Sequence, residues 1–426
     1  MLMRGSHFLA NVPLVLVVML VGVMAQAVAG QVTPDVGTGA AYQCVESGPT
    51  IEWQPEPWAP ERRVLRVGPA ETLETPSQAA AKAQDGDVVL IEAGEYVGDS
   101  AVWRQNGLLI RGVNGRPRLV GRGRLAEDKA IWVINGAEAT VENIEFSGAR
   151  VPSLNGAGIR AQGRGLTVRA SAFLDNQMGI LTNNSADNSL VVEFSEFGFN
   201  GMDSGRFHHG LYAGRIGSLT VRFSYFHHGR RGHLLKSRAT VNDVRYNRFI
   251  DGQDGQASLE LDFSEGGDVT VVGNVIDQAA TSPNVHVISY AAEAQGSKGG
   301  QFVVAFNTIL TRRRNTVFVA NRSVTTGMVA FNVFAGAQEL STSGPLTLFA
   351  NKLVGPDNLV DADAGDYRLV SSLPVASLDT TGGTLDLMAV KPAFEPASMT
   401  GARHRVERTP PTAGAFADCS ASKVPE

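Results

Sequence analysis

Cysteine is scarce in this chain of 426 residues, which contains only Cys44 and Cys419. At most one disulfide can therefore form within it, and only an oxidising compartment would preserve that bond. The two cysteines stand near opposite ends of the sequence, so they can pair only if one end of the chain folds back toward the other. Pairing and non-pairing are both open at this point.

Blocks of basic residues are also missing. The chain carries 37 Lys and Arg against 42 Asp and Glu, which gives a net charge of −5, and no basic run could follow a phosphate backbone. Nucleic acid is therefore excluded as a partner. No two histidines stand at HxH or HxxxH spacing, so the sequence does not support a histidine-based metal site.

Only one long apolar run occurs, from Phe8 to Met24, and the small residues of the segment AQAVAG follow it. With Arg4 ahead of the run, residues 1–29 have the pattern of a signal peptide that is cleaved after Ala29. An uncleaved membrane anchor is the alternative, but no basic stop-transfer cluster follows the run. We expect a secreted or periplasmic protein without stable membrane association.

The chain is rich in glycine, with 47 residues, and it contains a repeat. Many short apolar segments and 43% hydrophobic residues favour an all-β fold with a large core. Large apolar residues recur every 23 to 33 residues, and from residue 247 onward an Asn stands two positions before most of them. Strand-only repeats of this length predict a β-helix, in which stacked Asn side chains join successive coils. The apolar ladder consists of Phe146, Phe173, Phe197, Phe226, Phe249, Ile276, Ile309 and Phe334.

After the signal peptide, the repeat divides the chain into three segments. Residues 30–60 are irregular, rich in Pro, Gly and Thr. Residues 61–359 form the β-helix, and a short Ala-rich helix from Ser77 to Gln84 caps its first coil. Residues 360–426 lose the period and form a last partial coil and a C-terminal tail.

Several stretches resemble a known superfamily. QAAAKAQDGDVVLIEAGEY is similar to the opening cap and first strand of the right-handed parallel β-helices of the pectin-lyase-like superfamily, and DYRLVSSLPVASLD and TAGAFA resemble their C-terminal end. HHGLYAG, GHLLKSRA (a GHxxKSRA motif) and ASLELDFSEGG resemble a group of bacterial secreted β-helix proteins. The resemblance implies an all-β, right-handed parallel β-helix. It leaves the reaction open, because this fold carries lyases, hydrolases, epimerases and non-catalytic binders.

The same motifs place polar side chains on the outside of the coil, because the residues of a strand alternate between interior and exterior. If Leu235 and Ser237 face inward, Lys236 is exposed on the outer face, whereas the opposite register would bury its ammonium in the core. Coils stacked about 4.8 Å apart then carry two outward columns. The first column reads Arg160, Leu181, Tyr212, Lys236, Glu260 and His286; the second reads Gly214, Arg238 and Asp262, and His208 and His209 lie in the turn before Tyr212.

These groups suit β-elimination in a polysaccharide that contains uronic acid. The reaction needs a cation for the substrate carboxylate, a base for the C5 proton and an acid for the leaving oxygen. We expect Lys236 to be the base and Tyr212 or His209 to be the acid. The substrate would be an anionic polysaccharide bound by Arg238, Arg160, His208 and His286.

The Lys236–Ser237 pair also resembles the base-bearing strand of chondroitinase B-like alginate lyases, in which an Arg on the following coil acts as the acid. In this chain Glu260 takes that place, which makes Glu260 a further catalytic candidate and departs from the pattern of that family. The chemistry requires no cofactor. A calcium ion near Glu260 and Asp262 stays open, because several β-helix lyases hold calcium in such a place.

Three other functions stay open. A glycoside hydrolase of this fold would need several clustered Asp residues on adjacent coils, and the sequence offers no third carboxylate beside Glu260 and Asp262. A uronate epimerase would share the proton abstraction. A non-catalytic binder or adhesin would need aromatic residues along the wall, but aromatics make up 7% of the chain. The polar groups cluster at 208–290, which favours an enzyme, and we expect it to act as a monomer.

Overall fold

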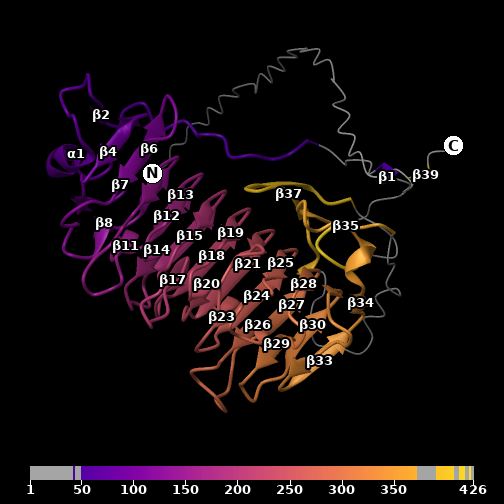
Figure 1. The fold of residues 1–426 in the computed structure, drawn as a ribbon. Coiled ribbons are helices and arrows are strands. Elements are labelled where there is room, and N and C mark those ends of the chain that lie inside the picture. Colours follow the sequence, from indigo (N-terminus) through magenta and orange to yellow (C-terminus); the bar gives the residue numbers. More distant parts are fainter. Residues whose placement is uncertain (1–41, 44–48, 372–389, 407–411, 418–421, 424–426) are drawn as a thin grey trace, which may run out of the picture. The chain divides into compact units, whose positions relative to one another are not determined.

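The computed structural model describes residues 42–43, 49–371, 390–406, 412–417 and 422–423 (Figure 1). The predicted signal peptide, Cys44 and Cys419 lie outside the described residues. None of the helices within the described ranges is long and apolar enough to cross a membrane.

Each coil of the chain contributes one strand to each of three parallel sheets, which we call sheets 1, 2 and 3 in the order in which a coil visits them (Figure 1). Sheet 1 consists of β5 (Ala101–Trp103), β8 (Ala130–Ile134), β11 (Ala157–Ala161), β14 (Met178–Thr182), β17 (Leu211–Ala213), β20 (His233–Ser237), β23 (Leu259–Phe263), β26 (His286–Tyr290), β29 (Val317–Asn321) and β32 (Thr342–Ser343). Sheet 2 consists of β2 (Val64–Val67), β3 (Val88–Glu92), β6 (Leu109–Val113), β9 (Ala139–Glu142), β12 (Leu166–Arg169), β15 (Ser189–Glu193), β18 (Ser218–Arg222), β21 (Val241–Arg245), β24 (Asp268–Val272), β27 (Phe302–Ala305), β30 (Gly327–Ala330) and β33 (Leu346–Phe349). Sheet 3 consists of β4 (Glu95–Val97), β7 (Arg118–Val120), β10 (Glu145–Ser147), β13 (Ala172–Leu174), β16 (Glu196–Gly198), β19 (Tyr225–His227), β22 (Arg248–Ile250), β25 (Val275–Gln278), β28 (Thr308–Thr311), β31 (Val333–Ala335) and β34 (Lys352–Val354).

The predicted capping helix is present as α1 (Pro76–Lys82), beside the first strands of the stack. Pro76 stands at its first turn, where a missing backbone N–H costs nothing. The helix buries Ala79 and Ala80 and ends because Ala83 takes an extended conformation. It therefore covers apolar surface that the open end of the stack would expose.

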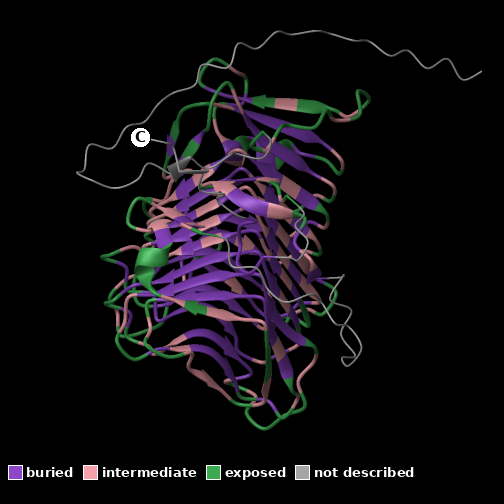
Figure 2. Cartoon of the chain, turned by 90° about the vertical axis from the view of Figure 1, so that its right-hand side faces the viewer, coloured by how far each residue is buried: buried purple, intermediate pink, exposed green. Residues whose placement is uncertain are grey.

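The predicted apolar ladder is confirmed and fills the interior. Sheet 3 pairs its eight members in direct register, from Phe146 opposite Phe173 to Ile309 opposite Phe334. Neighbouring rings stack, with centroids 4.5 Å apart for Phe197 and Phe226. Figure 2 shows the strands of the stack mainly as buried and many of the connecting turns as intermediate or exposed.

The predicted Asn ladder is also confirmed and lies in the two-residue turns between sheets 2 and 3. The Asn247 side chain donates to Asn274 Oδ1 at 3.0 Å, and Asn274 donates to Asn307 Oδ1 at 2.9 Å. The ladder continues from Asn307 through Asn332 to Asn351. Buried turn amides thereby find partners on the next coil, which satisfies polar groups that would otherwise destabilise the interior.

The C-terminal part leaves the stack and packs against its outside. A 3₁₀ turn (η1, Pro356–Asn358) leads into the antiparallel pair of β35 (Leu359–Asp361) and β36 (Asp366–Leu369), and β37 (Phe394–Ser398) pairs with β38 (Gly401–His404). The backbones of β1 (Tyr42–Gln43) and β39 (Ser422–Lys423) also pair. Tyr367 and Phe416 join an apolar cluster with Phe306, Phe331 and neighbouring residues of sheets 2 and 3.

Candidate functional site

The outer face of sheet 1 carries a row of side chains from successive coils. Arg160 pairs with Leu181, Leu181 with Tyr212, and Tyr212 with Lys236. This part of the predicted column is confirmed. On the next coil the partner of Lys236 is Asp262, so the expectation that Glu260 stands beside Lys236 is wrong.

The predicted outward orientation of Glu260 is also wrong. Its position on the coil is that of Gly210 and Leu234, and a side chain at Gly210 would point toward the ring of Phe226 in the core. Two consecutive residues, Leu234 and Leu235, face the interior at the start of β20, so the strict alternation assumed from the sequence fails there. The position of Glu260, which pairs with that of Leu234, therefore faces inward.

Glu260 therefore lies inside the stack. It is fully buried, and neither carboxylate oxygen has a hydrogen-bond partner. Burial, and next the charge of Asp251, raise the pKa of Glu260 well above its ordinary value. A neutral carboxylic acid in the core has no access to a substrate on the outer face, which removes Glu260 from the candidate site.

Lys236 faces outward as expected, but the expectation that it is exposed is wrong. It is 8% exposed, because the loop after β26 covers it. Its ammonium donates to Glu293 Oε1 at 2.6 Å and lies 3.2 Å from Asp262 Oδ2. Asp262, which is 4% exposed, also accepts a hydrogen bond of 2.6 Å from Ser264. Lys236 is thus held between two carboxylates.

Glu293 is the functional residue that sequence reasoning missed. It joins the two predicted cations, because its second oxygen accepts hydrogen bonds from Arg238 at 2.9 and 2.5 Å. Glu265 lies 3.2 Å from Arg238 and also accepts two hydrogen bonds from Arg215. Neither Glu293 nor Glu265 lies on a strand with an alternating pattern, so no periodicity marks their position.

Tyr212 lies beside these cations. The guanidinium carbon of Arg238 is 5.2 Å from the centre of its ring, and Lys236 Nζ is 6.0 Å from it. The phenol is partly exposed, and among the described residues no side chain or backbone group forms a hydrogen bond with its hydroxyl. A phenol that borders two cations and faces solvent can exchange a proton with a bound molecule.

Two histidines form the layer behind Tyr212. The His209 ring lies 5.2 Å from the Tyr212 ring and 4.8 Å from that of His233, and His209 Nδ1 accepts the backbone N–H of His233 at 3.1 Å. Burial, and next the charges of His233 and Lys236, hold the pKa of His209 well below its ordinary value. Burial likewise lowers the pKa of His233 to about 4. Both rings are therefore neutral at pH 7, and neutral His209 carries its proton on Nε2.

The other predicted binding residues are more dispersed. Arg160 lies in the same column, half-buried, with a buried Nε that has no hydrogen-bond partner, and burial lowers its pKa. His208 is buried and bonds to Ser204 at 2.6 Å. His286 bonds to Asn284 and pairs with Val317, so it stands apart from the column that contains Tyr212 and Lys236.

The residues proposed for calcium do not fit that ion. Calcium takes about six to eight oxygen ligands, but Glu260 is in the core and Asp262 faces the ammonium of Lys236. In the part of the chain that the structure describes, no group of three or more His, Cys, Asp or Glu side chains could hold a metal ion.

Comparison with family models agrees with the fold. Residues 129–326 match the family model described as "Right handed beta helix region". The structure of an alginate lyase from Paenibacillus sp. strain FPU-7 is similar with a TM-score of 0.40 and 14% identity, over 64% of this chain and 95% of that one. Pectate lyase Pel9A is similar with a TM-score of 0.42 and 14% identity, over 84% of this chain and 98% of that one. No curated protein matches the sequence. The fold is a right-handed parallel β-helix, as the sequence predicted.

Proposed function

We propose that the protein is a polysaccharide lyase that cleaves a uronic-acid polymer by β-elimination on the outer face of sheet 1. The observation that supports this most is the placement of Tyr212 between Arg238 and Lys236, 5.2 and 6.0 Å from its ring. One phenol and two cations supply the proton-transfer group and the carboxylate partners that the reaction requires.

In this reaction the C5–H bond of the uronate breaks and its electrons form the C4=C5 double bond. The C4–O bond breaks at the same time, and the leaving oxygen takes a proton to become a hydroxyl. No oxidant or cofactor is needed for this balance. A cation at the substrate carboxylate makes the C5 proton more acidic, because it stabilises the charge that develops there.

Two assignments of the proton transfer are compatible with the site. Lys236 can take the C5 proton while Tyr212 protonates the leaving oxygen, after which Lys236 returns the proton to Tyr212. Alternatively Tyr212 performs both steps as phenolate and then phenol. The ion pairs of Lys236 with Asp262 and Glu293 favour the second assignment, because its nitrogen is held by two carboxylates and would have to leave them to reach the C5 proton. His209 remains a candidate acid behind Tyr212 through its Nε2 proton.

The polymer would lie along the stack, across the coils of Arg160, Tyr212 and Lys236. Arg160 has an unpartnered guanidinium nitrogen and would bind a carboxylate of a sugar away from the cleavage point. Arg238 would bind the carboxylate of the reacting sugar in exchange for part of its contact with Glu293. We further propose that the protein acts after export, as residues 1–29 indicate, on an anionic polysaccharide outside the cytoplasm.

A glycoside hydrolase is the second candidate, because the structure adds the carboxylate that the sequence did not show. The oxygens of Asp262 and Glu293 that contact Lys236 lie at most about 6 Å apart, near the ~5–5.5 Å of retaining glycosidases. A general acid requires a raised pKa, however. Burial raises the pKa of Glu293, but hydrogen bonds from Lys236 and Arg238 outweigh it and leave the pKa below its ordinary value. This disfavours hydrolysis.

The test is a screen of alginate, pectate, hyaluronan and chondroitin for the unsaturated product, which absorbs in the far ultraviolet, alongside a reducing-end assay. A lyase produces both signals, whereas a hydrolase produces only reducing ends. No signal on any uronate polymer would refute the proposal.

On the active polymer, Tyr212→Phe should lower kcat by about 10²–10⁴-fold, because it removes the proton-transfer group alone. Tyr96→Phe, which removes a phenol near the N-terminal cap, is the matched control and should leave kcat unchanged. Lys236→Arg separates the two assignments: Arg cannot act as a base, so turnover is lost if Lys236 is the base. Substantial turnover in Lys236→Arg with loss in Tyr212→Phe would assign both steps to Tyr212.

A further inference from the structure

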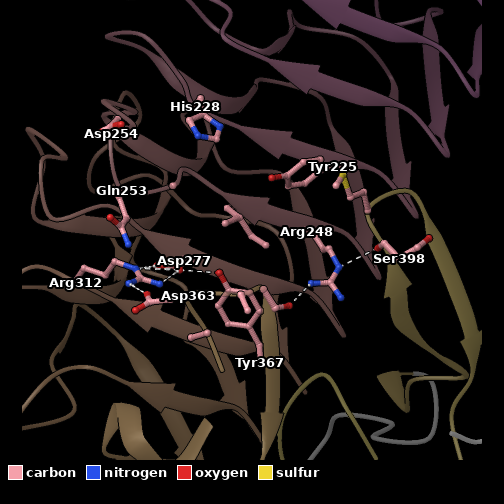
Figure 3. Close-up of a pocket in the computed structure, with 16 residues that line it drawn as sticks. Tyr225, His228, Arg248, Gln253, Asp254, Asp277, Arg312, Asp363, Tyr367 and Ser398 are labelled. Atoms are coloured by element: carbon pink, nitrogen blue, oxygen red, sulfur yellow. Dashed lines mark hydrogen bonds and ion pairs between the residues drawn. The ribbon is translucent and has the colours of Figure 1, made fainter. Parts of the chain in front are cut away.

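A pocket of about 550 Å³ lies on a different wall, the outer face of sheet 3 (Figure 3). Strands β19, β22 and β25 form its floor, and the C-terminal segments around β36 and β37 form its sides. Its volume is within the range of about 300–1,000 Å³ that small-molecule sites occupy. None of the groups that we assign to catalysis on sheet 1 lines this pocket.

Arg248 supplies the charge of this pocket. Its Nε donates to the backbone oxygen of Ser398 at 2.9 Å and its Nη1 to that of Gly365 at 3.2 Å (Figure 3). These carbonyls orient the guanidinium without neutralising it, and no carboxylate of the described residues forms an ion pair with Arg248. A half-buried cation without a counter-ion attracts an anion from solution.

A second group, His228, presents a ring nitrogen to the pocket. His227 Nε2 lies 3.0 Å from Glu196 Oε1, and His227 Nδ1 lies 2.8 Å from His228 Nδ1. The hydrogen bond from His227 holds the pKa of Glu196 below its ordinary value, so the carboxylate is ionised and accepts from His227 Nε2. The Nδ1 atoms of the two histidines are engaged with each other, which leaves Nε2 as the second ring nitrogen of His228.

Burial, and next the charge of His227, lower the pKa of His228, which keeps its ring neutral at neutral pH. Among the described residues, none forms a hydrogen bond with His228 Nε2. A hydroxyl group of a ligand suits this nitrogen, because a hydroxyl can donate or accept a hydrogen bond. The contacts among Glu196, His227 and His228 thus leave one neutral ring nitrogen for a polar group at that side of the pocket.

The remaining side chains restrict the charge of the ligand. Arg312 is already paired with Asp277 and Asp363, and the Tyr367 hydroxyl donates to Asp277 at 2.7 Å, so these groups close one side of the pocket. Together with Asp254, the lining holds three carboxylates against two guanidinium groups. Such a pocket disfavours a phosphate dianion or a run of carboxylates and tolerates one negative charge.

We propose that this pocket binds a single carboxylated sugar, with its carboxylate on Arg248 and its hydroxyls on His228, Tyr225 and Asp254. One guanidinium without a carboxylate partner matches one carboxylate, which its Nη2 can bind, and the neighbouring polar groups match sugar hydroxyls. The inference rests on the chemistry of the pocket and does not depend on catalysis at Tyr212.

The experiment is titration calorimetry with galacturonate, glucuronate and mannuronate, each compared with its neutral hexose. We expect at least one acid to bind, and its neutral counterpart to bind about tenfold more weakly or not at all, because the charged hydrogen bond to Arg248 is lost. Arg248→Gln and His228→Phe should each weaken binding of the acid by about tenfold or more. Arg245→Gln is the matched control, because Arg245 lies on the neighbouring sheet and pairs with Asp243.

Arg248 also ties the C-terminal segments to the stack, so Arg248→Gln can loosen the pocket itself. His228→Phe leaves those ties in place and keeps the test decisive if Arg248→Gln unfolds. Binding to the Tyr212→Phe variant should equal that of the wild type, which separates this site from the proposed catalytic one. The proposal would be overturned if acid and neutral sugars bound equally, or if no acid bound at all. It would also be overturned if inorganic phosphate bound more tightly than the acids, or if His228→Phe bound the acid as well as the wild type.

Discussion

Replacing Lys236 with Met should destabilise the protein strongly, although the residue lies on the outer face of a sheet. Met has a similar length and no charge, so the change removes the ion pairs and leaves the packing nearly intact. Asp262 would then remain 4% exposed without a cation, with one oxygen that already lacks a partner. The hydrogen bond from Ser264 would still support it, and His233 Nε2 lies 3.5 Å from the same oxygen.

The expected loss is about 3 kcal/mol of unfolding free energy, the lower end of the ~3–5 kcal/mol found when one partner of a buried ion pair is removed. The lower end applies because Ser264 continues to stabilise Asp262. The contact with Glu293 adds at most about 1 kcal/mol, because that carboxylate is 40% exposed and keeps its bonds to Arg238.

Urea unfolding followed by the fluorescence of Trp103 and Trp132, both fully buried, measures this loss. The double variant Lys236→Met with Asp262→Asn is the critical comparison, because it also removes the buried negative charge of Asp262 that the single variant leaves without a cation. It should recover about 2 kcal/mol relative to the single variant. If the unfolding free energy of Lys236→Met were within about 0.5 kcal/mol of the wild-type value, Lys236 would be solvated and the reasoning wrong. If the effects of the two substitutions on the unfolding free energy simply added in the double variant, the pairing of Lys236 with Asp262 would be refuted.

Two further predictions concern the layer behind the site and the turns. The folded-state pKa of His233, about 4, lies below the ordinary value of 6.5, so between these values the unfolded chain binds a proton that the folded chain does not. The contribution of His233 to stability should fall by up to about 3 kcal/mol as pH drops from 6.5 to 4. His233→Gln should reduce the slope of unfolding free energy against pH in this window, and the remaining slope includes the contribution of buried His209. Asn274→Ala should cost about 2–4 kcal/mol in urea unfolding, because it removes the acceptor of the buried backbone N–H and side-chain amide of Asn247. Asn351→Ala, at the end of the ladder, should cost less, and equal losses at both positions would contradict the ladder as a cooperative element.

Most of the fold could be predicted from the sequence, because its coils repeat at a regular spacing. A coil must bring equivalent residues to equivalent positions, so Phe226 and Asn274 can be assigned to the interior and to a turn from spacing alone. The column from Arg160 through Tyr212 to Lys236 followed in the same way, because within one strand the side chains alternate. These assignments depend only on local backbone geometry.

Contacts between residues far apart in the sequence were visible only in the tertiary structure, because local backbone geometry does not specify them. Two inward residues in succession, as at Leu234 and Leu235, put Glu260 in the interior, and the pairing of Leu235 with Leu261 put Asp262 beside Lys236; no alternating pattern reveals either. Glu293 reaches Lys236 across 57 residues of sequence from a loop whose path depends on packing. The pocket on sheet 3 depends on Ser398, which contacts Arg248 across 150 residues. Contacts of this range arise only when the stack and its C-terminal cover are both in place.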